Sequence, residues 1–292
     1  PSGRPDLQGV WDFRSLTPMQ RPRALGEQEV FTLEEAAEFS ADTIRSRSRD
    51  SETSDRAARV AQGDIIPYND FWFDEGTSVT SDRTSLIVDP PDGRMPPLMP
   101  EAERRRSADR EARRGVGADE PPPGGWVEDL PDRVRCTRGF NSGPPLTPSA
   151  YNNNMQLFQT PGYVVVLAEM VHDARIISMD GRPLPPAEIS QWSGSSRGRW
   201  EGDTLVVETR NLRAEAYQGS TQTMRLIERF TRVDIDTLMD EVTVEDPAIW
   251  TTPWTFQLPM AKNDGEIYPA LPGPRKNLPG VSSHGQLVDL GA

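Results

Sequence analysis

The chain has 292 residues, of which 35% are hydrophobic. This length is enough for one large domain or two small ones with a sizeable buried core. The formal net charge of −13 argues against a surface that binds DNA, RNA or anionic membranes, because such surfaces need an excess of positive charge. One cysteine and two histidines exclude an internal disulfide and a histidine-rich metal site, so we expect no metal and no other cofactor.

The longest apolar stretch, Tyr163 to Ala168, is far shorter than the roughly 18 residues that a membrane-spanning helix needs. We therefore expect no transmembrane segment.

The first half of the chain predicts short elements separated by irregular segments. Thr32 and Glu35 have the spacing of a helix capping box, and apolar residues follow at helical spacing to about Arg47. A Pro- and Gly-rich stretch over 115–148 cannot form regular elements, and long loops of this kind are often lids or binding arms. The predicted elements are a strand over 7–13, a helix over 33–47, a strand over 84–88 and a charged surface helix over 101–114.

The second half is rich in Val, Ile, Thr and aromatic residues, in short runs separated by turn residues such as Pro161-Gly162 and Asp180-Gly181. This pattern predicts an antiparallel meander. The predicted strands cover 155–160, 163–169, 174–178, 198–200, 204–209, 224–233, 237–245 and 254–258. Several alternating strands without intervening long helices indicate a mainly β protein, either an antiparallel β-barrel or a strongly curved sandwich.

We expect residues 1–292 to form a single domain. Its parts are an N-terminal strand and arm (1–30), a helical and Pro-rich insertion (31–150), the β-barrel core (151–260) and an irregular tail (261–292).

Four motifs together resemble a largely uncharacterised family of secreted bacterial proteins. The motifs are Pro5-Asp6-Leu7-Gln8-Gly9-Val10-Trp11, Tyr151-Asn152-Asn153-Asn154, the segment His172-Asp173-Ala174-Arg175-Ile176-Ile177, and the segment from Arg199 to Val207. The Gly-x-Trp start is also similar to that of lipocalin-like barrels, and this likeness implies a calycin-type barrel. The resemblance, together with a start at Pro1 rather than methionine, implies a secreted or periplasmic location in a bacterium.

The first candidate site is centred on His172, because histidine is the side chain best suited to proton transfer near neutral pH. Asp173 or Glu169 would orient the imidazole. If the strand stays extended, His172 and Asp173 point to opposite faces, so they pair only across a bulge. The alternative is a structural histidine beside an ion pair of Asp173 with Arg175.

Other residues could hold a substrate. We expect Arg175, Tyr151 and Asn153 to bind a substrate oxygen, although runs of asparagine also form ordinary turns. An aromatic ligand would suit one or two tryptophans at a pocket mouth, and we take Trp200 as the first choice. The tryptophans in or beside the β half are Trp11, Trp192, Trp200, Trp250 and Trp254.

A second group of charges lies on two neighbouring predicted strands, with Glu228-Arg229 on one and Asp240-Glu241 on the other. Cross-strand ion pairs explain them without any function. If Glu228 and Asp240 instead face a closed interior, burial would raise their pKa values and make one of them a general acid.

Gly194-Ser195-Ser196-Arg197-Gly198 matches the Gly-x-Ser-x-Gly pattern of serine hydrolases. Its context differs, because a nucleophile elbow lies between a strand and a helix, whereas a strand and hairpin follow here. Only His284 follows Ser196 among the histidines. We therefore expect a glycine–serine turn.

These observations favour a metal-independent enzyme that acts on a hydrophobic or aromatic small molecule in a barrel pocket. General acid–base chemistry of this kind suits elimination, isomerisation, hydration or hydrolysis, that is, a lyase, isomerase or hydrolase. The first alternative is a non-catalytic secreted protein that binds apolar small ligands. The second is an extracytoplasmic interaction module whose long arm contacts a partner.

Overall fold

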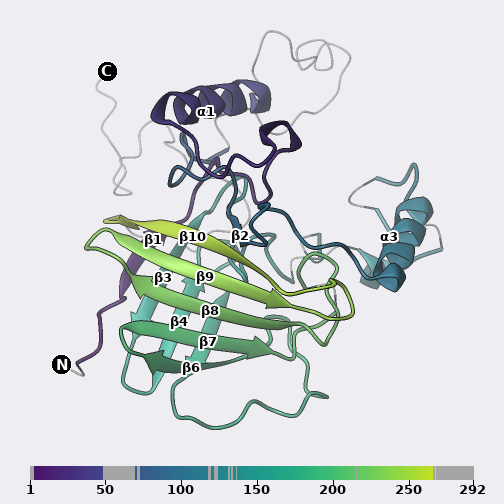
Figure 1. Ribbon diagram of the computed structural model, residues 1–292. Coiled ribbons are helices and arrows are strands. Elements are labelled where there is room, and N and C mark those ends of the chain that lie inside the picture. The colour runs from purple at the N-terminus through teal and green to yellow at the C-terminus, as the bar shows by residue number, and fades with distance from the viewer. Residues whose placement is uncertain are drawn as a thin grey trace, which may run out of the picture.

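A computed structural model shows a closed β-barrel (Figure 1). The structure describes residues 3–48, 70, 73–117, 120–121, 124–130, 132, 134–135, 137–214, 216–265 and 267. The strands in these residues are β1 (Gly9–Asp12), β2 (Ile87–Asp89), β3 (Asn154–Gln159), β4 (Tyr163–Ala168), β5 (Ala174–Ser178), β6 (Ser195–Glu201), β7 (Thr204–Arg210), β8 (Arg225–Arg232), β9 (Thr237–Glu245) and β10 (Trp254–Asn263).

The barrel closes because β1 pairs with both β3 and β10. Around the ring of described strands the order is β1, β3, β4, β5, β6, β7, β8, β9 and β10, and β2 pairs with the other half of the long strand β10. The predicted mainly β barrel is thus confirmed. The N-terminal strand β1, which lies within the predicted strand over 7–13, completes it.

One pair of neighbours differs from the predicted meander. β5 and β6 run parallel, with Ile177 opposite Ser196 and Ser178 opposite Arg197. Parallel neighbours need a crossover of about a dozen residues or more, and the chain over 179–194 supplies it. The turn residues Asp180-Gly181 predict a hairpin directly after β5. Instead, the proline-containing segment that follows them returns along the barrel before β6 begins, so that β6 runs parallel to β5.

The two predicted helices are confirmed within one or two residues. α1 covers Leu33–Arg47 and α3 covers Pro100–Ala112. The capping box of α1 is complete, because the Thr32 side chain accepts a hydrogen bond from the Glu35 amide and the Glu35 carboxylate accepts one from the Thr32 amide. Two short 3-10 helices, η1 (Arg23–Leu25) and η3 (Val127–Asp129), lie in the connections. No described helix is long and apolar enough to cross a bilayer.

The core occupies the inside of the barrel. Alternate residues of β8 and β9 are fully buried while their neighbours are partly exposed, which is the expected pattern for strands with one face inward. The bulkiest fully buried side chains of the barrel include Trp11, Trp254, Phe230 and Phe256. Large apolar side chains therefore fill much of the space in which we expected a ligand.

Parts of the predicted insertion contact the barrel at several points. β2 pairs with β10, and the Met99 amide just before α3 donates to the carbonyl of Ile249. Within α3, Arg105 donates to the carbonyl of Gly219 and Arg106 donates to the carbonyl of Gln218. Figure 1 shows α1 above one end of the barrel and α3 beside it. Most of the predicted tail, including His284, and residues 49–69 of the insertion lie outside the described residues.

Candidate functional site

His172 lies in the turn between β4 and β5 and is exposed to solvent. Its φ is 47° and that of Val171 is 51°, a left-handed conformation that ends the extended chain at this point. The side chain therefore does not project into the barrel interior. This placement removes the argument that favoured His172, which assumed an extended strand leading into a hollow.

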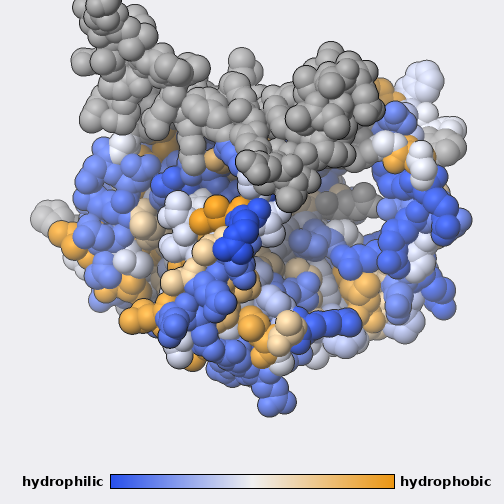
Figure 2. Space-filling model, turned by 90° about the horizontal axis from the view of Figure 1, so that it is seen from above, coloured by the Kyte–Doolittle hydropathy of each residue, from blue (hydrophilic) through white to orange (hydrophobic). Residues whose placement is uncertain are grey.

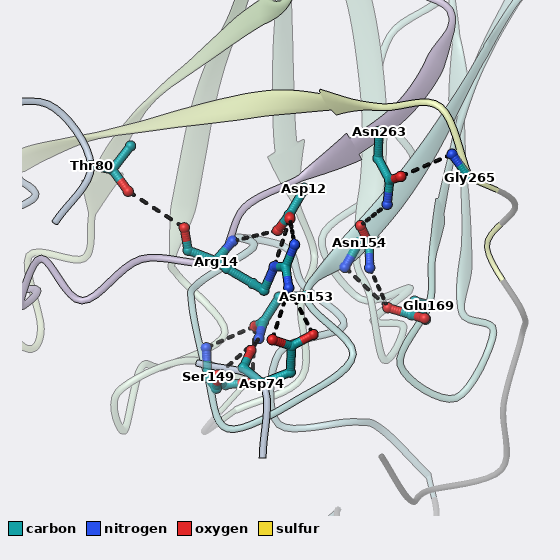
Figure 3. A network of polar contacts seen from close by, with 10 residues as sticks. All are labelled: Asp12, Arg14, Asp74, Thr80, Ser149, Asn153, Asn154, Glu169, Asn263 and Gly265. Atoms are coloured by element: carbon teal, nitrogen blue, oxygen red, sulfur yellow. Dashed lines mark hydrogen bonds and ion pairs between the residues drawn. The ribbon is translucent and has the colours of Figure 1, made fainter. Parts of the chain in front are cut away.

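The two carboxylates proposed to orient His172 contact other groups. Asp173 accepts a hydrogen bond from the Ser193 hydroxyl at 3.0 Å. Glu169 accepts one from the Asn154 side chain at 2.8 Å (Figure 3). Burial raises the pKa of Glu169, and the hydrogen bonds from Asn154 act in the opposite direction. The described residues show no hydrogen-bonded triad around His172.

The side chain of Asn153, just before β3, connects this strand to the segments that contain Asp74 and Ser149. Its side-chain amide donates to the carbonyls of Asp74 and Ser149 and accepts from the Ser149 amide at 2.8 Å, as Figure 3 shows. The residue is 1% exposed, and both amide hydrogens are used. Tyr151 packs edge-on against Phe140 with ring centroids 5.2 Å apart. These contacts match the structural alternative for the asparagine run.

Arg175 lies inside the barrel, where it is 9% exposed. Its guanidinium donates to both carboxylate oxygens of Glu228, at 2.5 and 2.9 Å. Glu228 and Asp240 are both 0% exposed. Glu228 and Asp240 therefore face the interior of the barrel. Their neighbours in the chain, Arg229 and Glu241, face outward and lie opposite each other on β8 and β9.

Asp240 differs from Glu228 because neither of its oxygens has a hydrogen-bond partner in the described part of the chain. Burial raises the pKa of this carboxyl well above its usual range, the negative charge of Glu228 raises it further, and Arg175 opposes the shift. Perturbed carboxyls of this kind are common at functional sites. Arg175, Glu228 and Asp240 form what we call the interior charge cluster.

Ser196 is a strand residue and not a nucleophile at an elbow. It lies in β6, and its hydroxyl is 2.8 Å from that of Thr209 on β7. Gly194 has a φ of +67°, and a Cβ built there would lie 2.6 Å from the carbonyl oxygen of Arg210. The glycine is thus required by the backbone where the parallel strand begins.

Gly194→Ala is expected to lower the free energy of unfolding more than Gly202→Ala. Gly202 has a similar φ of +61° with no atom within 4 Å of the added Cβ, so alanine there should cost only the left-handed strain of about 1–2 kcal/mol. The backbone clash at Gly194 should add about 1–3 kcal/mol. Urea unfolding of both variants checks this prediction, and equal losses would contradict it.

A cavity of about 670 Å³ lies outside the strands, between α3 and the end of the barrel. We call it the α3 cleft. Figure 2 shows a hollow between the body of the molecule and the side that carries α3. The cleft is lined by aromatic residues and arginines, namely Phe140, Trp192, Tyr217, Arg113, Arg135, Arg138 and Arg213, and by the acidic residues Asp109, Glu128, Asp129 and Asp132.

Trp192 has cationic neighbours in this cleft. The Arg213 guanidinium lies 4.0 Å from the centroid of its ring, and that of Arg135 lies 5.9 Å away. Trp200, our first choice among the tryptophans, lies elsewhere on the barrel, where Arg4 is 5.8 Å from its ring. Of the five tryptophans considered, Trp192 is the one that lines the cleft.

Sequence reasoning missed Arg138, Arg213 and Tyr217. Of these three, only Arg138 lies in a segment that the sequence had singled out, the Pro- and Gly-rich stretch over 115–148, which we expected to be a lid or binding arm. Described residues between Glu128 and Thr147 in that stretch supply much of one wall of the cleft.

Among the described residues, no group of three or more His, Cys, Asp or Glu side chains is arranged to hold a metal ion. Comparison of the chain with protein-family models, curated proteins and solved structures gave no match.

Proposed function

We propose that this protein binds a small molecule with an aromatic ring system in the α3 cleft. The observation that carries the proposal is the lining of the cleft, where the aromatic rings of Phe140 and Trp192 lie beside the side chains of several arginines. Its volume of about 670 Å³ lies within the range of small-molecule pockets, about 300–1,000 Å³. Such sites combine apolar walls with a few polar groups that orient the ligand.

An extracytoplasmic setting in a bacterium is part of this proposal. It is supported by the resemblance of the Tyr151-Asn152-Asn153-Asn154 motif and its three companions to secreted bacterial proteins. A binding role also agrees with the packing of the barrel, because the interior is occupied by core residues such as Trp254 and Phe256, whereas the cleft is open to solvent.

Binding can be tested with 2-naphthoate and 2-naphthamide as aromatic probes, by isothermal titration calorimetry. We expect at least one of them to bind, and Trp192→Ala to weaken that binding about tenfold, since one lost aromatic contact is worth about 1–3 kcal/mol. Trp200→Ala is the matched control, because this ring lies outside the cleft. If neither probe binds, or if the two variants weaken binding equally, the proposed site is wrong.

Acid–base catalysis is the second candidate, and the raised pKa of the Asp240 carboxyl favours it. A carboxyl that is protonated near neutral pH can serve as a general acid for elimination, isomerisation, hydration or hydrolysis without a metal. Asp240 is fully buried, so a substrate would have to enter the barrel.

Mass spectrometry of a bound probe, recovered after incubation, separates this candidate from simple binding. Gain or loss of water, or another change that Asp240→Asn abolishes, would support catalysis there. A change abolished only by His172→Ala would restore the turn histidine as the acid–base residue. Unchanged probe with the wild-type protein leaves the binding function.

A further inference from the structure

The outer face of strands β3, β4 and β5 carries no charged side chain. These strands lie on the side of the barrel away from β8 and β9, as Figure 1 shows. Alternate residues of each strand point outward, and the largest of them are well exposed: Ile176 is 63%, Tyr163 is 47% and Phe158 is 40% exposed. We call the apolar residues of this face the β4 patch, which consists of Phe158, Tyr163, Val165, Leu167, Ala174 and Ile176.

The β4 patch is continuous because its residues are in register across the three strands. Phe158 lies opposite Val165, and Val165 lies opposite Ile176, so these three side chains form one row around the barrel. Tyr163 and Leu167 lie on either side of Val165 along β4. Since directly opposite side chains on antiparallel strands are only about 4.5–5.5 Å apart at Cβ, the row presents a single apolar surface.

The outer face on the other side of the barrel is charged instead. There Arg225 forms ion pairs with Glu208 and Glu245 at 3.0 and 2.9 Å, and Arg229 forms one with Glu201 at 3.0 Å. In a chain of which 26% of the residues are charged, three adjoining strands without a charge on their outer face are unusual. Contiguous exposed apolar patches of a few hundred Å² mark interaction surfaces.

Two features favour a second copy of this chain as the partner. The formal net charge of −13 makes two copies repel each other, and an uncharged face is the one on which they can meet with the least repulsion. The row is also nearly symmetric about Val165, with one large apolar side chain on each side. A two-fold axis parallel to β4 would therefore place Phe158 of each copy against Ile176 of the other, and Val165 against its counterpart.

We propose that two copies of this protein associate face to face through the β4 patch, as a two-fold symmetric dimer. The patch presents apolar area on the order of 400 Å², about half of the 800 Å² that each partner buries in a standard interface. Slightly more than half of such an interface is apolar, so the patch is large enough for its apolar centre. The α3 cleft lies outside the strands, and the dimer is therefore independent of the proposed binding function.

Sedimentation velocity of the full chain measures this association, over concentrations from about 1 to about 100 μM, because interfaces of this size have micromolar or lower dissociation constants. We expect a monomer–dimer equilibrium for the wild type. Ile176→Glu should weaken the dimer at least about tenfold, since it places an unpaired charge against the Phe158 ring. Ile235→Glu is the matched control, because it adds the same charge at an isoleucine that is 71% exposed in the turn between β8 and β9.

The two-fold arrangement is tested by cross-linking. In a Cys136→Ser background, Val165→Cys should cross-link to its counterpart through a bismaleimide that spans about 10 Å, the distance between packed sheets, whereas Ile235→Cys should not. Thermal unfolding shows whether each variant is folded, and Ile176→Ser is the milder substitution if Ile176→Glu is not.

A monomer at every concentration, or equal weakening of the dimer by Ile176→Glu and Ile235→Glu, would overturn the proposal. A dimer without the Val165→Cys cross-link would overturn the two-fold arrangement. Binding of a monomeric wild type to neutral phosphatidylcholine vesicles, lost in Ile176→Glu, would overturn the proposal in favour of a lipid surface as the partner of the β4 patch.

Discussion

Arg175→Met is expected to lower the free energy of unfolding by about 3–5 kcal/mol, which is the usual cost of removing one partner of a buried ion pair. The guanidinium is the cation that contacts Glu228 inside the barrel, with both terminal nitrogens on the carboxylate. Without it, Glu228 and Asp240 would remain buried together as two carboxyls with no compensating charge among the described contacts. Equilibrium unfolding in urea measures the loss.

The control for this variant is Arg229→Met. Arg229 is adjacent to Glu228 in the chain but faces outward, where its side chain is 37% exposed and forms an ion pair with Glu201 at 3.0 Å. Such exposed pairs contribute about 0–1 kcal/mol. The double variant Arg175→Met, Glu228→Leu should recover part of the loss, because apolar replacement of a whole buried pair is often neutral. A loss below about 1 kcal/mol for Arg175→Met would mean that water reaches the interior charge cluster.

Part of the interior charge cluster could be predicted from the alternation of apolar and polar residues along the strands. The parity of β8 and β9 follows from the sequence, because apolar residues recur at every second position beside Glu228 and Asp240. The side of the sheet that the carboxyls face is then set by these apolar neighbours. Their partner Arg175 was not predicted, since it lies on β5, across the barrel and 53 residues away in the chain.

The α3 cleft could not be predicted in the same way. Most of its described lining residues lie in irregular chain, between Glu128 and Thr147 and from Arg213 to Tyr217. In such segments no periodicity of the sequence indicates which way a side chain points. The Arg138 guanidinium is held by hydrogen bonds to the carbonyls of Gly143 and Ala216. Because every residue has a backbone carbonyl, the sequence does not show which ones accept these bonds. The orientation of His172 could not be predicted either. The prediction assumed an extended strand, and the positive φ values at Val171 and His172 interrupt the strand at this point.

Asp240→Asn is expected to stabilise the protein at neutral pH, by about 1.4 kcal/mol for each pH unit over which only the folded state keeps the carboxyl proton. The pKa of Asp240 in the folded protein is raised well above the ordinary value of 3.8. Between these two values the folded state binds more protons than the unfolded state, so stability falls as pH rises through the window. Asparagine has nearly the same shape and cannot ionise, so the variant should lack this loss.

The measurement is urea unfolding of both proteins over a pH series from below 3.8, the ordinary carboxyl pKa, to neutral. The two proteins should converge at the acid end, where the carboxyl is protonated in both states, and separate as pH rises. Glu241→Gln is the matched control, because that carboxylate lies next in the chain, is half-buried and accepts a hydrogen bond from Gln257 at 3.0 Å. A constant difference at every pH would show that Asp240 does not titrate in this range. If Asp240→Asn gains stability and still binds the naphthalene probes like the wild type, the interior charge cluster acts independently of the α3 cleft.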